Sequence, residues 1–501
     1  MATVDQQQKH LDLKSALATL TLSDETLHVV KGRVSEALSK GLTKEYNNDS
    51  SLKMLPTYVR DTPDGTEGGD FLALDLGGTN FRVLRVQIDK EDEGKVHMDN
   101  QVYKMPQDVM TGSGEELFDY IAESIGNFLE VYDLKNVKLP LGFTFSFPCV
   151  QEGLDRGSLL RWTKGFSASG VVGNDVVQLL QEAVGRMEEE YELEVVALVN
   201  DTVGTMMSCG HEDHDCVIGM IVGTGTNACY MEKTGNVEAL SEEDRGDGEG
   251  QMCINTEWGA FGERGELEDI VTEYDRAVDQ RSINPGCMIY EKMISGMYMG
   301  EVVRNILVDL VQSGSILGGH LTEKLNTFGD FETAFVTQIE LDHSPKLRMA
   351  AQVLRHLGYD SEDLNIQKPP GHDYPENCTL ADRQAVREVC EAVSTRAAHL
   401  CASGVAALLE RIMKNRESSG VIDARNMTVG VDGTVYKKHP HFRRLLESKV
   451  RDLLPVDTRV TFRMSHDGSG KGAALVTAVA CRMSGIVSKQ LGSVETHLGP
   501  S

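Results

Sequence analysis

The alternation of apolar and polar positions in residues 71–86 (FLALDLGGTNFRVLRV) predicts two strands joined by a glycine turn. Residues 71–74 form an apolar run typical of a buried strand. Residues 81–86 partly alternate, as in a strand covered on one face. The two glycines between them lack a Cβ and tolerate positive φ, so a ligand can approach the backbone, and successive N–H groups there suit a phosphate. Asp75 could hold a cation. Because Gly-Gly pairs also form ordinary hairpin turns, this segment alone leaves both interpretations open.

The same pattern recurs twice further along the chain. Residues 216–230 (CVIGMIVGTGTNACY) predict a strand, a Gly-Thr-Gly turn and a second strand. Residues 427–436 (MTVGVDGTVY) predict a third such unit, with Asp-Gly-Thr at its bend. We therefore expect two related α/β halves, each with a hairpin that faces phosphate, and a nucleotide in the cleft between them.

The remaining pattern predicts strands separated by helices. Apolar runs predict strands at residues 138–147 and 194–199, and helical periodicity predicts helices before residue 66 and after residue 113. The later helices are expected at residues 176–191, 267–282, 288–313 and 378–416, with a solvated loop at residues 241–250.

Residues 467–472 (DGSGKG) precede a helix of small residues at 473–483 and superficially look like a phosphate-binding P-loop. The pattern fails, because Ser465 stands where the first glycine belongs and Gly472 stands where Ser or Thr should follow lysine. A glycine-rich helix start either faces a phosphate or packs closely on a neighbour, and the sequence favours neither.

Composition limits the class of protein. The chain has 501 residues, of which 40% are hydrophobic and 25% charged, which is typical of a globular protein with two or three domains. A net charge of −28 argues against a nucleic acid or an anionic membrane as partner. A phosphate ligand must therefore be attracted locally, by backbone donors, a few Lys or Arg side chains and a metal ion.

Cysteine usage and the N-terminal pattern predict a cytoplasmic location. The ten cysteines include no C-x-x-C pair, which favours reduced thiols in a cytosolic enzyme. The first 20 residues lack the pattern of a signal peptide, and no apolar run approaches the roughly 20 residues of a membrane span. The Cys- and His-containing segment at 209–216 matches no usual zinc spacing and is more typical of an acidic surface loop.

Polar residues gather at predicted strand ends and loops. Asn200 and Asp201 follow an apolar strand, where Asp201 could either cap the helix expected at 202–209 or act as a general base. Other residues of this kind are Ser146, Thr163, Lys164, Asn227, Glu257 and Glu291. Singly, each is typical of a cap, a salt bridge or a surface position. Together they are the carboxylates, amides and hydroxyls that hydrogen-bond a polyhydroxylated ligand, which suggests phosphoryl transfer to a sugar hydroxyl.

Eight segments of the chain, in order, resemble the hexokinase family: DLGGTNFRV, LPLGFTFSFP, RWTKGF, VNDTVGTM, VGTGTNACYME, NTEWGAFG, NPG…YEKMISGMYMGE and VGVDGTVYKKHPHF. The resemblance runs from about residue 10 to about residue 483. It implies an actin-like ATPase (ribonuclease H-like) α/β fold, with two α/β domains around a deep cleft. The implied divisions are an N-terminal helical segment at 10–63 that packs on the large domain, a small domain at 64–199 rejoined by a helix at about 467–483, a large domain at 200–466, and a tail at 484–501.

The resemblance also implies a reaction: ATP-dependent phosphorylation of the 6-hydroxyl of glucose, and of fructose and mannose, to give hexose 6-phosphate and ADP as the first step of glycolysis. Magnesium would enter as MgATP. We expect a cytoplasmic monomer that binds no nucleic acid and does not insert into a membrane.

Residue roles carry over by motif. The implied catalytic residues are Asp201, as the base for the 6-hydroxyl, and Lys164. The implied sugar-binding residues are Ser146, Phe147, Thr163, Lys164, Asn200, Asp201, Asn227, Glu257 and Glu291. The implied ATP-binding residues are Asp75, Leu76, Gly77, Gly78, Thr79, Asn80, Thr224, Gly296, Thr333, Thr337, Gly433, Thr434 and Lys437, with stretches 333–337 and 434–438 on the adenosine side. Asp75 would reach the metal through water.

Two other classes of function remain open. A catalytically silent sugar sensor would keep the same fold and the same implied sugar-binding residues, which we call the sugar set. An actin-like scaffold or chaperone ATPase would keep the hairpins but has no use for the sugar set. Because Lys164 belongs to one predicted domain and Glu257 and Glu291 to the other, bound sugar is expected to close the cleft.

Overall fold

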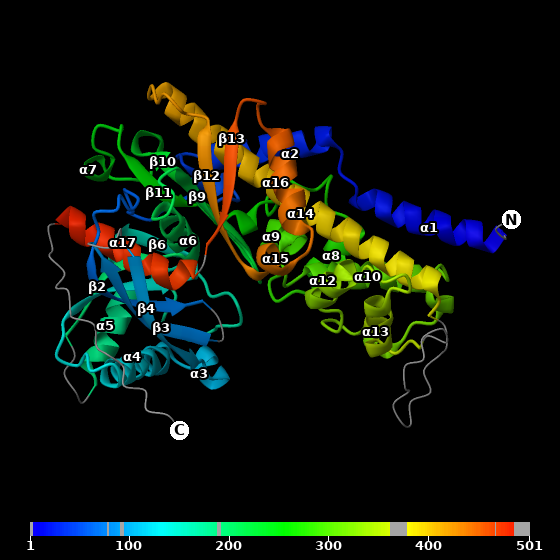
Figure 1. Ribbon diagram of the computed structural model, residues 1–501, viewed down its shortest axis with the longest axis horizontal. Helices are drawn as coiled ribbons and strands as arrows, with labels where there is room; N and C mark the ends of the chain where they lie inside the picture. Colours follow the sequence, from blue (N-terminus) through cyan, green and yellow to red (C-terminus); the bar gives the residue numbers. More distant parts are fainter. Residues whose placement is uncertain are drawn as a thin grey trace.

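The structure is a computed structural model that describes residues 4–77, 80–90, 95–187, 192–360, 378–465 and 467–484. The predicted Gly78 and Thr79 contacts and most of the C-terminal tail lie outside these ranges. The described strands form three sheets (Figure 1). The first has the order β4 (Lys95–Lys104), β3 (Asn80–Asp89), β2 (Gly69–Leu76), β5 (Leu139–Phe145), β8 (Leu193–Val199). The second has the order β1 (Leu55–Pro56), β11 (Gln251–Asn255), β10 (Thr226–Lys233), β9 (Cys216–Val222), β12 (Asn426–Asp432), β13 (Arg459–Met464), and β6 (Cys149–Gly153) pairs with β7 (Arg156–Leu159).

The two large sheets repeat one topology. In the first, β2 pairs antiparallel with β3 and parallel with β5, which pairs parallel with β8. In the second, β9 pairs antiparallel with β10 and parallel with β12, which pairs parallel with β13. Strands β4 and β11 extend the two hairpins on the outside, also antiparallel. The prediction of an actin-like α/β fold with two related halves is therefore confirmed, and both predicted hairpins, at 71–86 and 216–230, form.

The third predicted hairpin, at 427–436, is wrong. Strand β12 leads through Gly433 into helix α15 (Thr434–Lys438) instead of a second strand. The reason is that β12 lies between β9 and β13 and is parallel to both. A two-residue turn joins only antiparallel strands, and a parallel neighbour is reached by a crossover that contains a helix.

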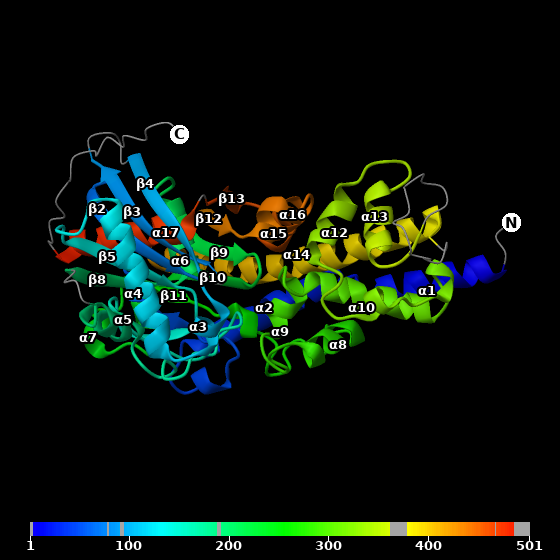
Figure 2. The same ribbon diagram turned by 90° about the horizontal axis from the view of Figure 1, so that it is seen from below.

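Some helices lie against these sheets, and others, among them α1 (Val4–Leu20), α10 (Met299–Gln312) and α13 (Arg348–His356), form the opposite end of the molecule (Figure 2). We call the first sheet and its connections the first lobe, and the second sheet and its connections the second lobe. The first lobe contains α3 (Gln107–Thr111), α4 (Gly114–Val131) and α5 (Val176–Gly185), and it leads into α6 (Asp201–Gly210). Elsewhere lie α2 (Asp24–Gly41), α7 (Glu242–Arg245), α8 (Glu273–Arg281), α9 (Ile289–Ile294), α11 (Glu323–Asn326), α12 (Thr333–Leu341), α14 (Leu380–Ser418), α16 (Phe442–Leu453) and α17 (Gly468–Ser484). Short 3-10 helices are η1 (Asn47–Asp49), η2 (Thr234–Asn236), η3 (Trp258–Ala260) and η4 (Leu317–Gly319).

Helix α14 is a single helix of 39 residues, where the sequence predicted several helices. It is the one helix in the described part of the chain that is long and apolar enough to cross a membrane, but 83% of its most apolar window is buried within the molecule. It packs against α2, α10 and α16, as the core helix of a globular lobe does. Conversely, the helix predicted at 288–313 is divided into α9 and α10 around Gly296.

Two helices each follow a strand of one sheet but pack on the other sheet. Helix α6 follows β8 of the first sheet but packs on β9 and β12 of the second, whereas α17 follows β13 of the second sheet and packs on β2, β5 and β8 of the first. The two helices cross each other, and a Cβ added to Gly472 would lie 2.1 Å from the carbonyl oxygen of Gly204. The glycine-rich start of α17 therefore packs closely on a neighbouring helix, which is one of its two predicted roles.

Candidate active site

Asp201 is the first residue of α6 and does not cap it. The cap is Asn200, whose Oδ1 accepts the backbone N–H of Thr202 at 3.0 Å and the Thr202 hydroxyl at 2.7 Å. The Asp201 carboxylate is thus not required for capping, the structural role that the sequence left open for it. Instead its Oδ2 lies 4.0 Å from Nζ of Lys164, which comes from a loop of the first lobe.

The environment of Asp201 favours its protonated form. Burial raises the pKa of this carboxyl, and the negative charge of Asp75 raises it further. Lys164 and a hydrogen bond with Ser146 act in the opposite direction. The net rise in pKa makes the Asp201 carboxylate a stronger proton acceptor than an exposed aspartate, which suits a general base.

The loop that carries Lys164 is fixed by its backbone and by aromatic packing. Lys164 and Gly165 both have left-handed φ, at 56° and 84°, and the Phe166 N–H donates to the Thr163 carbonyl at 3.1 Å. Nζ of Lys164 donates to the Ser146 carbonyl at 2.9 Å and lies 5.6 Å from the centre of the Phe147 ring. Lys164 and Ser146 therefore lie beside Asp201, and Phe147 lies under the Lys164 ammonium.

The second lobe contributes a hydrogen-bonded group of amides and a carboxylate. Oε1 of Glu257 accepts from Nδ2 of Asn255 at 2.8 Å and from Nδ2 of Asn227 at 3.2 Å, and Asn227 also donates to Oδ1 of Asn255 at 2.8 Å. Glu257 is only 7% exposed and has a left-handed φ of 51°. Burial raises the pKa of Glu257, against the hydrogen bond from Asn255, and Asp201 raises it further. That electrostatic link places Glu257 in the same neighbourhood as the candidate base.

Glu291, on α9, approaches the second hairpin closely. Its Oε2 accepts the backbone N–H of Thr226 at 2.9 Å. A Cβ on Gly225 would lie 2.5 Å from that same oxygen, so a larger residue there would displace the Glu291 carboxylate. Burial raises the pKa of Glu291 to about 7, opposed by the Thr226 N–H and by Lys164. Lys164 of the first lobe thus acts to lower the pKa of both glutamates of the second lobe, against the effect of burial.

On the phosphate side, Asp75 is paired with an arginine. Oδ2 of Asp75 accepts from Nε and Nη2 of Arg82, at 3.2 and 2.7 Å, and from the Ser469 hydroxyl at 2.7 Å. Nη2 of Arg82 also lies 2.5 Å from Oδ1 of Asp467, at the start of α17. Although burial lowers the pKa of Arg82, its two carboxylate partners raise it overall. The bonds that Asp75 already makes on Oδ2 fit a contact with a metal through water better than direct ligation.

The predicted phosphate-binding residues of the second lobe lie on two neighbouring turns. The Gly223 N–H donates to the Gly225 carbonyl at 2.9 Å, and the Gly296 N–H donates to the Gly223 carbonyl at 2.8 Å. Gly433 has a φ of 110°, and a Cβ there would lie 2.2 Å from the Val222 carbonyl oxygen. The turn of the second hairpin and the turn before α15 are therefore adjacent, with Thr224 and Thr434 exposed beside them.

The other predicted ATP residues are more scattered. Leu76 is buried at the end of β2, Gly77 follows it close to Ser146, and Asn80 is exposed at the start of β3. Thr333 and Thr337 lie on α12, where the Thr333 hydroxyl accepts the Gly300 N–H at 2.9 Å. Lys437 is paired with Asp432 at 2.5 Å.

Sequence reasoning missed three polar residues of this site: Arg82, Asn255 and Ser469. The signal for Arg82 was present, because hairpin register places it directly opposite Asp75. Asn255 lies two residues before Glu257, at the end of β11, and could have been found as another strand-end amide. Ser469 could not, because its approach to Asp75 depends on the return of α17 to the first sheet.

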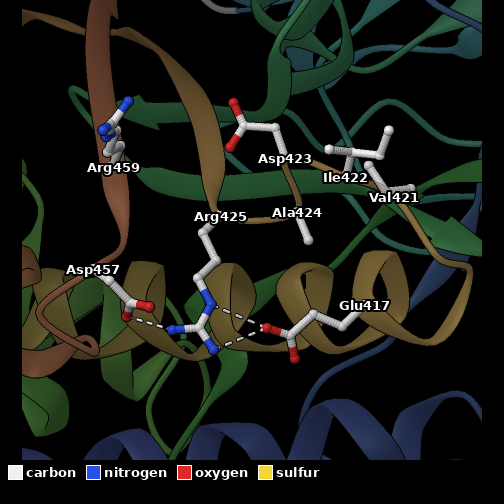
Figure 3. A pocket seen from close by; sticks show the side chains of 8 residues that line it. All are labelled: Glu417, Val421, Ile422, Asp423, Ala424, Arg425, Asp457 and Arg459. Carbon is white, nitrogen blue, oxygen red and sulfur yellow. Dashed lines mark hydrogen bonds and ion pairs between the residues drawn. The ribbon is translucent and has the colours of Figure 1, made fainter.

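A pocket at the C-terminal end of α14 contains none of the predicted site residues (Figure 3). Its volume is about 360 Å³, and Arg425 crosses it to pair with Glu417 and Asp457. A cavity of about 10 Å³ contains Phe147 and Asn200, together with Asn255. Size therefore does not identify the site. In the described ranges, no group of three or more His, Cys, Asp or Glu residues is placed to hold a metal ion.

Comparison with known proteins agrees with this geometry. Two family models, both described as hexokinase, match residues 12–211 and 217–479. Human hexokinase-2 is 53% identical over 475 residues, which cover 95% of this chain and 49% of the human protein. Hexokinase-1 of Pongo abelii is 50% identical over 476 residues, with the same coverage. The chain thus spans about half the length of these curated relatives.

Solved structures extend the likeness to the fold. The hexokinase of Schistosoma mansoni, complexed with glucose, is 43% identical, has a TM-score of 0.82 and covers 95% of this chain and 99% of its own. Another hexokinase crystal structure is 30% identical, has a TM-score of 0.75 and covers 94% of this chain and 99% of its own. Together with the two family models, these matches show that the chain belongs to the hexokinase family.

Proposed function

We propose that this chain transfers the terminal phosphoryl group of MgATP to the 6-hydroxyl of a hexose, giving hexose 6-phosphate and ADP. The observation that carries the proposal is the state of Asp201. Its carboxylate is not used as a helix cap, has a raised pKa and lies 4.0 Å from Lys164, beside a buried set of amides and glutamates. A general base next to groups that bind hydroxyls is what phosphoryl transfer to a sugar needs.

The first half of the reaction concerns the sugar. From one side the carboxylates of Glu257 and Glu291 accept hydrogen bonds from sugar hydroxyls, while Asn227 both donates and accepts. From the other side Ser146, Thr163 and Asn200 both donate and accept. Asp201 takes the proton of the 6-hydroxyl as the oxygen attacks phosphorus. Lys164 lowers the pKa of Asp201 against the effect of burial and adds positive charge where negative charge develops.

The second half concerns the phosphates. The glycine turn after β9 lies against Gly296 and Gly433, so its backbone can approach a phosphate closely, whereas Arg82 is already paired with the two carboxylates of Asp75 and Asp467. Magnesium enters with ATP as part of the substrate and neutralises phosphate charge. Asp75, already bonded to Arg82 and Ser469, orients the water around that ion.

Finer features belong to the same proposal. We expect fructose and mannose to be accepted besides glucose, and the protein to act as a cytoplasmic monomer in the first step of glycolysis. All ten cysteines are free, and most are buried, which is consistent with a reducing compartment.

The test is a coupled assay of ADP release, run on the wild type and Asp201→Ala, with and without glucose. Glucose-dependent ADP release in the wild type and its near loss in the variant would support the proposal. Equal activity in both proteins would contradict it. Calorimetric titration with glucose separates the alternatives. Sugar binding without turnover would favour a silent sensor, and ATP turnover independent of sugar would favour a scaffold ATPase.

A further inference from the structure

Helix α12 carries a buried carboxylate on the same side as two predicted adenosine residues. Thr333, Thr337 and Glu340 follow one another at spacings of four and three, which places them on one side of a helix. The two threonines are half-buried, whereas the Glu340 side chain is only 1% exposed. This side of α12 therefore continues from the predicted nucleotide surface into the interior.

Helix α15 ends at a buried histidine. It begins directly after Gly433, and His439 is its C-cap. Nδ1 of His439 accepts the backbone N–H groups of His441, at 3.3 Å, and Phe442, at 3.2 Å, at the start of α16. Because Nδ1 accepts, the neutral ring carries its proton on Nε2.

The two helices meet through these side chains. Nε2 of His439 lies 3.3 Å from Oε1 of Glu340, and both side chains are 1% exposed. Within the described ranges, neither atom makes a hydrogen bond with any group, because their 3.3 Å contact is close in distance but does not have hydrogen-bond geometry. A buried polar atom is costly unless it is paired, so each of these atoms depends on the other.

We propose that the Glu340–His439 pair positions the two sides of the adenosine site, with Thr333 and Thr337 on one side and Thr434 and Lys437 on the other. Both are positioning residues, since they act through α12 and α15 without contact with the nucleotide. The inference rests on the proposed function and deepens its ATP site. The sugar set belongs to other elements, so loss of the pair weakens nucleotide binding and leaves sugar binding intact.

The sharpest variant is His439→Asn. The asparagine Oδ1 can replace Nδ1 as acceptor for the start of α16, while the group facing Glu340 is lost. We expect KM for ATP to rise about ten-fold, with kcat at saturating ATP and KM for glucose changed less than about two-fold. His439→Gln, whose amide nitrogen can occupy the place of Nε2, should restore KM for ATP. Calorimetric titration with ADP should reproduce the loss without turnover.

A second disruption and a matched control complete the test. Glu340→Leu should repeat the effect, and it decides the question if the asparagine variant does not fold. Asp70→Asn breaks another buried pair, Asp70–Arg85, at 2.7 Å in the first lobe, and should leave KM for ATP unchanged.

The proposal is overturned if folded His439→Asn and Glu340→Leu keep KM for ATP within two-fold of the wild type. It is also overturned if KM for glucose rises equally, or if Asp70→Asn gives the same rise in KM for ATP. Should the wild type phosphorylate no hexose, the proposed function fails by itself. The ADP titration still decides the role of the pair.

Discussion

The two halves of this molecule share one strand order but use the ends of equivalent strands differently. Strand β8 of the first sheet ends at Asn200 and Asp201, and β13 of the second sheet ends shortly before Asp467. Each aspartate stands at the start of the helix that crosses to the other sheet. Asp467 is paired with Arg82 at 2.5 Å and has a left-handed φ of 58°, whereas Asp201 faces the Lys164 ammonium at 4.0 Å.

The difference shows how one topology separates binding from proton transfer. The close contact of Asp467 with a guanidinium, which keeps its proton, gives that carboxylate a structural role. A carboxylate that is buried beside a more distant ammonium has a raised pKa and can accept a proton. Position in the fold is shared by the two aspartates, and burial, opposed by Lys164, raises the pKa of Asp201.

Asp201→Asn should have the largest effect on activity. The amide keeps the size of the side chain but cannot accept the hydroxyl proton, so kcat for glucose should fall by about 10² to 10⁴. Asp467→Asn should lower kcat only several-fold, through altered placement of Arg82. Initial rates of ADP release measure both, and similar losses in the two variants would contradict the division of roles between the strand ends.

Gly472→Ala tests whether the exchanged helices hold the halves together. The added Cβ would meet the backbone of Gly204 at 2.1 Å, where no side chain can move aside. We expect the free energy of unfolding to fall by about 3 kcal/mol, at the upper end of overpacking costs. Gly32→Ala is the control: it lies in α2 with nothing within 4 Å of the added Cβ and should stabilise by about 0.5–1 kcal/mol. Chemical denaturation measures both, and a neutral Gly472→Ala would mean that α6 and α17 separate easily.

Much of this arrangement could be predicted from local sequence pattern. The hairpins at 71–86 and 216–230 were predictable because an apolar run, a glycine turn and a second apolar run specify an antiparallel pair with little outside help. The position of Asp201 between a strand and a helix was predictable because it directly follows an apolar run. The segment at 427–436 has a similar local pattern yet forms a strand, a turn and a helix, since its neighbours in the sheet decide which connection is possible.

What could not be predicted depends on contacts between distant segments. Asp75 was expected to serve a metal, but its partner Ser469 lies 394 positions away and arrives only because α17 crosses between the sheets. The sequence pattern suggested Asp201 as a possible cap and did not point to Asn200, although Asn and Asp are about equally good N-caps and the two are adjacent. Geometry, not residue type, left Asp201 available for chemistry.

Asp467 is paired with an arginine, whereas burial raises the pKa of Glu291. This contrast predicts that the effect of Glu291→Gln on stability depends on pH. In the wild type the folded pKa of Glu291, about 7, exceeds its ordinary value of 4.5, so its contribution to stability is fully present below pH 4.5 and is lost as pH rises through 7. Glutamine stays neutral. The variant should therefore gain about 2 kcal/mol relative to the wild type between pH 5 and pH 8. Thermal denaturation across this range measures the gain, and a Tm difference that stays constant with pH would contradict it.

Lys164→Met should produce the smallest effect, a shift in the acid limb of the pH–rate profile. Lys164 is the cation that lowers the pKa of Asp201 against burial, so its removal should raise that pKa and require a higher pH for the ionised base. We expect the acid limb of kcat/KM for glucose to move up by about 0.5–1 pH unit, on top of a uniform loss of rate. The matched change Lys437→Met removes an ammonium paired with Asp432 and should leave the acid limb in place. If the two variants gave the same profile, the ammonium of Lys164 would not set the proton affinity of Asp201, and the comparison of strand ends would have to rest on burial alone.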